Sequence, residues 1–378
     1  MLWSSLYLMA SLPAAPAVSQ ADIDARFEES ARGARIRAYV EAQQKEQAIP
    51  GLSLAIAIDH SVVWSRAFGL SDLENAVPAT PQTVYRIASI SRLVTAICVM
   101  QLVQQGKIAL NTSVRDFVPE LPNKGHRITV EHILAHLSGI RPIKSSEELF
   151  NSKRYARLVD ALDPFKDDPL IAPPGQRFLY TPLAYTLLGL IVERVSGLGF
   201  RDYLKQHVFG PASMDAADVD DPTRIIPRRA RGYVRRKDGS VSNARFVDSS
   251  LLLPAEGIVA TAEDLAKLAI AWQSGRLVDA PLRDLMMTEY KTAGGYGTHY
   301  GLGCFVRTWA GRKIVGHGGW QPQVSSFLLI LPEDRIAVAI LANLEQADVK
   351  TMSLHIAKIL LGIDDPSLKR AREVSHED

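Results

Sequence analysis

The stretch that decides the fold reads Tyr85-Arg86-Ile87-Ala88-Ser89-Ile90-Ser91-Arg92 and runs directly into an apolar segment, residues 93–103. This pattern predicts that an irregular stretch becomes a helix near Ser89. At such a boundary a serine hydroxyl can face a cleft, beside the first free N–H groups of the helix. Arg92 follows three residues later on the same helical face, where a Ser-x-x-Lys nucleophile motif has its lysine. The alternative interpretation is that Ser89 is only a helix N-cap.

Two later stretches add candidates for the same cleft. Tyr180 precedes a predicted helix that starts with Pro182, so it is placed like Ser89, at a helix N-terminus. Its alternative interpretation is a core aromatic residue that caps the helix. The second stretch is Gly316-His317-Gly318-Gly319-Trp320, whose glycines let a backbone approach a ligand and whose strand edge would supply N–H groups. The alternative there is a tight turn between strands.

Composition excludes several classes of function. The chain has 378 residues, of which 47% are hydrophobic and 22% charged, as in a soluble protein able to bury a sizeable core. A formal net charge of +2 gives no indication of a nucleic-acid partner or of an anionic membrane surface. The two cysteines, Cys98 and Cys304, do not form a disulfide framework, and no His and Cys ligands occur at zinc spacing. We therefore expect neither a metal nor another cofactor.

The first twenty residues resemble a secretory leader. They are apolar and then rich in small residues, and Ala15-Pro16-Ala17 fits an A-x-A cleavage site. The usual positive region is missing, because the first basic residue is Arg26. We expect a periplasmic or secreted protein, with a mis-assigned start, a short membrane-associated leader and a cytoplasmic location as open alternatives. No later run of about 18 apolar residues predicts a stable membrane span.

Strand-like segments lie at both ends of the chain, with a helical region between them. The predicted strands are residues 52–58, 62–65, 301–306, 313–315, 325–330 and 336–341, and the predicted helices cover 22–47, the segment after Ser89, 130–136, 184–193 and 348–361. This order predicts an α+β fold in which one antiparallel sheet, built from both termini, is flanked by helices and joined by a mainly helical lobe. We expect one two-lobed domain over residues 21–365, with a charged flexible tail over 366–378.

Together these stretches resemble the serine β-lactamase-like and penicillin-binding-protein-like superfamily, which includes class C β-lactamases, D-aminopeptidase relatives and esterases of the same fold. Within it the chain most resembles the mitochondrial-type branch and its bacterial relatives. The likeness covers about residues 35–360. The matching stretches are 50–53, 85–91, 136–141, Tyr180 with Gly189 and 192–197, 261–265 and 317–319.

The resemblance implies acyl transfer through a covalent serine ester. It makes Ser89 the nucleophile, Tyr180 the residue that exchanges protons with the nucleophile and leaving group, and His317 the first residue of the third motif. The N–H groups of Ser89 and Trp320 would form the oxyanion hole. Gly318, Gly319 and Glu256 would contact the substrate, a small molecule or peptide. Mitochondrial-type relatives form filaments, which implies a homo-oligomer.

Three residues depart from the family pattern. Arg92 replaces the lysine, and an arginine cannot lose its proton to act as a base. Pro182 replaces an asparagine that would donate to the substrate, although mitochondrial-type relatives also lack it. Glu256 stands where relatives have glycine or, in class C enzymes, a tyrosine in the cleft wall. We expect Arg92 and Glu256 to form an ion pair, with a solvent-directed Glu256 as the alternative, and we expect Arg92 to lower the pKa of Tyr180.

Two hypotheses of function follow. The first is a serine hydrolase acting on an ester, peptide or amide, with weak activity because of Arg92. The second is a catalytically impaired pseudoenzyme that keeps the cleft for binding or the fold for assembly. Arg92 separates them, because the mechanism needs a titratable base.

Overall fold

The computed structural model describes residues 19–363. The predicted tail lies outside the described residues, as does nearly all of the predicted leader. The helices are α1 Gln20–Glu29, α2 Ala31–Glu46, α3 Ser91–Gln104, α4 Val130–Leu134, α5 Ser146–Leu149, α6 Leu183–Ser196, α7 Phe200–Leu204, α8 Gly210–Ala212, α9 Leu253–Glu256, α10 Ala262–Gln273, α11 Ala280–Met286 and α12 Val349–Leu361. The strands are β1 Gly51–Ile58, β2 Ser61–Asp72, β3 Val77–Pro78, β4 Tyr85–Arg86, β5 Asp218–Val219, β6 Tyr233–Arg235, β7 Val241–Asn243, β8 Ile258–Ala260, β9 Phe305–Trp309, β10 Arg312–Gln321, β11 Val324–Leu331 and β12 Ile336–Ala342.

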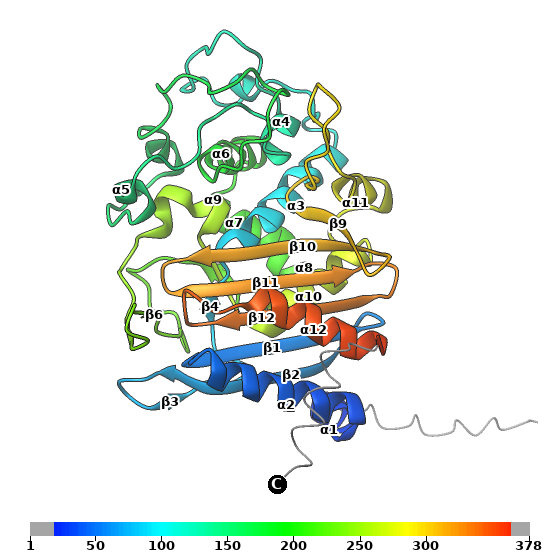
Figure 1. Cartoon of the computed structure of the whole chain (residues 1–378). Coiled ribbons are helices and arrows are strands. Elements are labelled where there is room, and N and C mark those ends of the chain that lie inside the picture. The colour runs from blue at the N-terminus through cyan, green and yellow to red at the C-terminus, as the bar shows by residue number, and fades with distance from the viewer. Residues whose placement is uncertain (1–18, 364–378) are drawn as a thin grey trace, which may run out of the picture.

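Both ends of the chain build one antiparallel sheet, as predicted. Its strand order is β3-β2-β1-β12-β11-β10-β9, so β1 from the N-terminal part pairs with β12 from the C-terminal part. Figure 1 shows this sheet below the mainly helical region that contains α3, α4 and α6. The α+β prediction is confirmed at the level of sheet and helix arrangement.

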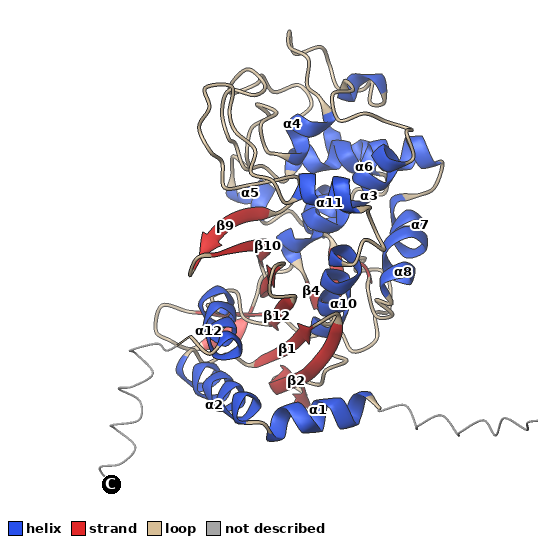
Figure 2. Ribbon diagram, turned by 90° about the vertical axis from the view of Figure 1, so that its right-hand side faces the viewer, coloured by secondary structure: helices blue, strands red, loops and turns tan. Residues whose placement is uncertain are grey.

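The sheet is buried on both faces because alternate side chains of its strands enter different cores. On β1, Leu54 and Ile56 pack into one core with Ile356 of α12, whereas Ala55 and Ala57 pack into the other. Figure 2 shows α2 and α12 on one side of the sheet and α10 on the other. We call the side of α2 and α12 the outer face and the side of α3 and α10 the inner face.

Several predicted boundaries need correction. The predicted helix 22–47 is divided at Ser30, whose side chain accepts a hydrogen bond from the Gly33 N–H and so starts α2. The predicted strand 301–306 begins only at Phe305, because Gly303 has a φ of +85° and packs against the backbone of α3. Residues 316–320, for which a turn was the alternative, lie within β10.

Helix length bears on the predicted absence of a stable membrane span. Within residues 19–363 no single helix is both long enough and apolar enough to cross a bilayer. One pair of consecutive helices, Leu183–Ser196 and Phe200–Ala212, together has the length and composition of a membrane span, but the two helices are bent by 79° relative to each other.

Candidate active site

Ser89 lies at the start of the helix that the sequence predicted. A short 3₁₀ turn, Ala88–Ile90, leads directly into α3. Ala88 has a φ of +48°, a left-handed conformation that non-glycine residues adopt at a cost and that is frequent at functional sites. Ser89 is only 7% exposed, yet it lines the largest cavity described below. The turn therefore presents the serine to the cleft.

A buried ion pair fixes the strand that precedes this turn. Arg86 Nε lies 2.8 Å from Asp220 Oδ2, and the guanidinium also donates to the carbonyl oxygen of Val247 at 3.0 Å. Asp220 in turn accepts a hydrogen bond from the Ser249 hydroxyl at 2.7 Å. Because these groups are nearly fully buried, they hold the segment before Ser89 in one place.

The glycines of β10 let this strand lie directly against the Ser89 turn. A Cβ on Gly319 would stand 2.5 Å from the Ile87 carbonyl oxygen and 3.0 Å from the Ala88 side chain. The Ser326 hydroxyl donates to the same Ile87 oxygen at 2.8 Å. The close approach requires glycine at this position and brings Trp320 to the cavity that Ser89 lines.

Tyr180 lies beside the serine, just before α6. Its side chain is 40% exposed, but its hydroxyl end is enclosed by protein groups that include the Ser89 hydroxyl. Burial raises the pKa of Tyr180, and the opposing effects of Arg92 and of the neighbouring Ser89 hydroxyl are smaller. The prediction that Arg92 would lower this pKa is therefore wrong in net direction, because desolvation outweighs the nearby cation.

The predicted ion pair between Arg92 and Glu256 is confirmed. Arg92 Nη2 lies 3.2 Å from Glu256 Oε1, with the arginine side chain fully buried and the glutamate side chain 16% exposed. Burial alone would lower the pKa of Arg92, but the acidic groups of Tyr180 and Glu256 outweigh it and raise the pKa. Burial raises the pKa of Glu256, against the effect of Arg92. Arg92 is thus a permanent cation in the cleft wall.

Arg92 also contacts aromatic rings. Its guanidinium carbon lies 4.6 Å from the ring centre of Tyr180 and 5.8 Å from that of Tyr185, within the range of cation–π attraction. Its Nε and Nη1 atoms are buried without a hydrogen-bond partner among the described residues. The guanidinium therefore depends on Glu256 and the aromatic faces for its stabilisation.

His317 is buried behind Tyr180 and does not line the cavity. Its Nδ1 lies 2.6 Å from the Gly318 carbonyl oxygen, which can only accept, so Nδ1 is the donor. Its Nε2 lies 2.9 Å from the Tyr300 hydroxyl and accepts from it. Burial, helped by the charge of Arg92, lowers the pKa of His317 to about 3. The ring is therefore neutral at physiological pH, unlike a lysine at this position.

Two further residues, to which the sequence analysis assigned no role, lie beside Tyr180 and His317. His136 is fully buried, has a φ of +58°, and lies 4.5 Å from Tyr180 and 4.9 Å from Tyr300 between ring centres. Burial lowers the pKa of His136 and raises that of Tyr300. His136 begins the stretch 136–141, which resembles the family, so this resemblance could have indicated that it lies near the site. Tyr300 follows a glycine-rich loop without periodicity, so nothing in the sequence indicated it.

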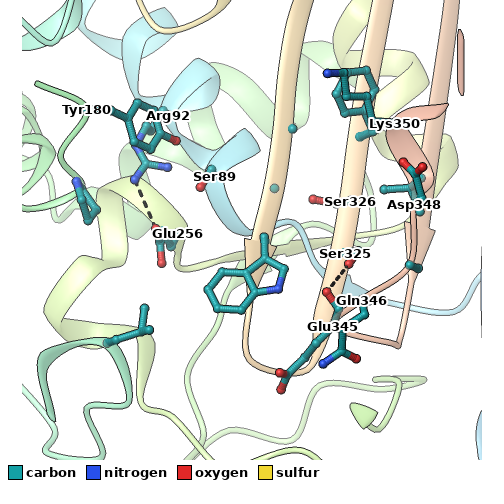
Figure 3. Close-up of a pocket in the computed structure, with 18 of the residues that line it drawn as sticks. Ser89, Arg92, Tyr180, Glu256, Ser325, Ser326, Glu345, Gln346, Asp348 and Lys350 are labelled. Carbon is teal, nitrogen blue, oxygen red and sulfur yellow. Dashed lines mark hydrogen bonds and ion pairs between the residues drawn. The ribbon is translucent and has the colours of Figure 1, made fainter. Parts of the chain in front are cut away.

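The predicted residues converge on a cavity of about 650 Å³. Its lining includes Ser89, Arg92, Tyr180, Pro182, Glu256, Gly318, Gly319 and Trp320, that is, every predicted site residue except His317. Figure 3 shows Ser89, Arg92, Tyr180 and Glu256 on one side of a strand and Gln346, Asp348 and Lys350 on the other. Over residues 19–363 no group of three or more His, Cys, Asp or Glu side chains is arranged to hold a metal ion.

The antiparallel sheet, the helical region and a serine at the start of a buried helix define a penicillin-binding-protein-like serine hydrolase fold. The Beta-lactamase family model matches residues 36–361, and the chain belongs to this family.

Similar proteins come from distant organisms. The human protein called serine beta-lactamase-like protein LACTB, mitochondrial, is 28% identical over 82% of this chain and 76% of its own length. Protein flp of Staphylococcus aureus MW2 is 27% identical over 85% of this chain and 65% of its own length. Among solved structures, an octameric penicillin-binding protein homologue from Pyrococcus abyssi is 27% identical, with a TM-score of 0.77 over 87% of this chain and 77% of its own. A D-amino acid amidase from Ochrobactrum anthropi, with a TM-score of 0.79 at 22% identity over 89% of this chain and 100% of its own, shares the fold.

Proposed function

We propose that this protein is a serine hydrolase that cleaves an ester, peptide or amide through an acyl-enzyme on Ser89. The observation that carries the proposal is the Ser89 side chain, which lines the same cavity as Tyr180 and is presented to it by a strained turn at a helix start. Membership of the Beta-lactamase family supports the same reaction class.

In the proposed reaction the Ser89 oxygen attacks the acyl carbon while its proton passes to the Tyr180 oxygen. The bond to the leaving group then breaks, and the leaving group takes the proton from Tyr180. Water hydrolyses the resulting serine ester by the same steps in reverse, releasing the acid and free Ser89. The N–H groups of Ser89 and Trp320 stabilise the negative oxygen of each tetrahedral intermediate, a contribution of about 3 kcal/mol per donor.

Arg92 determines which group can act as the base. A buried guanidinium held by Glu256 cannot accept a proton, so the role falls to Tyr180. The raised pKa of Tyr180 leaves little tyrosinate near neutral pH, which predicts slow turnover. Glu256 and the two glycines of β10 would contact the substrate from the cavity wall.

Intact-protein mass spectrometry after exposure to a fluorophosphonate, and separately to a penicillin, tests the proposal. We expect a single covalent adduct with the fluorophosphonate that is absent in Ser89→Ala. A wild-type protein that remains unmodified by both reagents, or an adduct that persists in Ser89→Ala, would contradict nucleophilic catalysis by Ser89.

The second candidate function is that of a catalytically impaired binding or assembly protein. The fixed charge of Arg92 supports it, because an arginine in place of the lysine leaves the site without the titratable base of the family. Absence of an adduct in the experiment above, together with ligand binding in the cleft, would favour this candidate.

Assembly and location belong to the proposal as well. The octameric Pyrococcus abyssi homologue supports a homo-oligomer, which sedimentation of the purified chain would test. The leader-like composition of residues 1–20 supports export to the periplasm or the medium. Cell fractionation with N-terminal sequencing distinguishes a cleaved, exported protein from a cytoplasmic one.

A further inference from the structure

Two cavities meet at the edge of the sheet. The first is the Ser89 cavity, and the second, of about 370 Å³, lies on the outer face between β9, β10, β11 and α12. Both are lined by Gly318, Phe327 and Lys350. We call the second cavity the outer-face groove. Because the two share these residues, a bound molecule can extend from one into the other.

The two cavities adjoin where β10 loses its neighbour. Strand β9 pairs with β10 only from Arg312 to Gly316, so in the described part of the chain no strand covers Gly318 on that side. Gly318 faces the outer side, where a Cβ would stand 3.2 Å from the ring of Phe327. Gly318 and Gly319 place no side chain between the Ser89 cavity and the outer-face groove, which share Gly318, Phe327 and Lys350.

The outer-face groove is apolar with a cationic rim. Its apolar lining consists of Phe305, Trp309, Ile314, Phe327 and Leu354, with the rings of Phe305 and Phe327 stacked at 5.6 Å. Arg307 and Lys350 also line it and have no ion-pair partner among residues 19–363. Such a lining favours an apolar chain that carries a negative charge, since burial of the chain and pairing of the charge are both favourable.

We propose that the outer-face groove binds the apolar chain of an acyl substrate whose carbonyl carbon lies at Ser89, with an anionic group on the chain directed to Arg307 and Lys350. The chain crosses the sheet edge over Gly318. From Gly318 to Ile314 the strand spans about 13 Å, so a short acyl group cannot reach the far end and a long one can. The substrate class is thus a long-chain acyl ester or amide, and this part of the inference rests on the proposed function.

A chain-length series tests the specificity. We expect kcat/KM for p-nitrophenyl dodecanoate to exceed that for the acetate by about tenfold, from the burial of the added methylene groups. A dodecanoate ester with a terminal carboxylate should be preferred further. Leu354→Trp, which fills the outer-face groove, should remove the dodecanoate preference and leave acetate turnover unchanged. The double variant Arg307→Glu/Lys350→Glu lies on the surface and should weaken only the carboxylated substrate. Lys237→Glu, an exposed charge reversal in the turn after β6, is the matched control.

A binding assay separates this inference from the proposed function. In Ser89→Ala, dodecanoate should displace a fluorescent fatty acid, and Leu354→Trp should weaken that displacement by about tenfold relative to Lys237→Glu. The double charge reversal should weaken displacement by dodecanedioate, whose second carboxylate can reach Arg307 and Lys350, and not by dodecanoate. Binding without any ester turnover would support the groove and contradict the hydrolase. Turnover with equal rates for the acetate and dodecanoate esters, or dodecanoate binding that Leu354→Trp does not change, would overturn the groove.

Discussion

Arg92 is the residue on which the chemistry of the cleft depends. A lysine at this position can release its proton and help to deprotonate a serine, whereas the guanidinium of Arg92 stays charged and is fully buried against Glu256. The positive charge also helps to keep His317 neutral. Burial is the larger cause of the pKa shifts of His317, Tyr180 and Glu256, while Arg92 adds to the shift at His317 and opposes it at the other two. Tyr180 remains as the group able to accept the serine proton.

Turnover should therefore increase toward alkaline pH. Because burial raises the pKa of Tyr180 above that of free tyrosine, about 10, the active tyrosinate accumulates only in the upper part of the pH range. We expect esterase rates to rise continuously from neutral pH through pH 10 without reaching a plateau below it. Tyr180→Phe should abolish the rise, whereas Tyr296→Phe, at an exposed tyrosine, should leave it intact. A plateau near neutral pH would identify a different base.

The ion pair between Arg92 and Glu256 should contribute measurably to the free energy of unfolding. Glu256→Gln leaves a buried cation without its anion, which we expect to lower the free energy of unfolding by about 3 kcal/mol in urea titrations. Asp59→Asn removes one partner of the exposed pair with Arg335 and should cost less than about 1 kcal/mol. Equal effects of the two substitutions would show that the buried pair has no special contribution.

The same pair should control the hydrolytic rate. Arg92→Lys with Glu256→Gly restores the family pattern and supplies a lysine that can titrate, so we expect the double variant to exceed either single variant by about a hundredfold. The full double-mutant cycle measures the coupling between the two positions. Effects that simply add, in both rate and stability, would show that the residues do not interact.

At the level of elements, the site depends on the contact between β10 and the 3₁₀ turn that holds Ser89. Glycine at 319 allows this contact, because any side chain would meet the Ile87 carbonyl oxygen and the Ser326 hydroxyl. The turn is fixed from the other side by the Arg86–Asp220 pair. Strand, turn and ion pair together determine where the serine hydroxyl lies relative to the N–H group of Trp320.

Gly319→Ala should therefore disturb the site more than the fold. Its Cβ would stand 2.1 Å from Ser326 Oγ, so β10 must shift away from the turn. We expect a loss of about 2 kcal/mol in stability and a strong slowing of fluorophosphonate labelling at Ser89. Gly199→Ala, where the added Cβ meets nothing closer than 3.6 Å, is the control. Labelling at the wild-type rate in Gly319→Ala would show that the close contact is not required.

The elements were largely predictable because their signals are local. The apolar runs 52–58 and 336–341 lie in β1 and β12, and the boundary at Ser89 follows from the apolar helix after it. The break at Ser30 was missed because a helical pattern continues across it. The net direction of the Tyr180 pKa was missed because it depends on how tightly distant segments enclose the hydroxyl, and no sequence pattern records that depth. Tyr300 contributes through three-dimensional contacts, which include those with His317 and His136.

For the whole molecule, the sheet joins residues that are almost three hundred positions apart. Ala55 pairs with Ala339, and α12 covers the outer face of the strands that the C-terminal segment contributes. Two cores, one on each face, share these strands. We propose that the two faces fold together and that residues 21–363 form one cooperative domain.

Unfolding should accordingly be a single transition that also removes the site. Met352 of α12 is fully buried in the outer core, on the opposite face of the sheet from Ser89, and Met352→Ala should lower the free energy of unfolding by about 3 kcal/mol. Because a cooperative domain unfolds in one step, the urea midpoints from far-UV circular dichroism and from loss of fluorophosphonate labelling at Ser89 should shift by the same amount. Thr351→Ala, at an exposed neighbour on the same helix, should move neither midpoint. Midpoints that separate in Met352→Ala would mean that the sheet with its outer helices unfolds independently of the helical region, and the prediction of one domain would then be wrong.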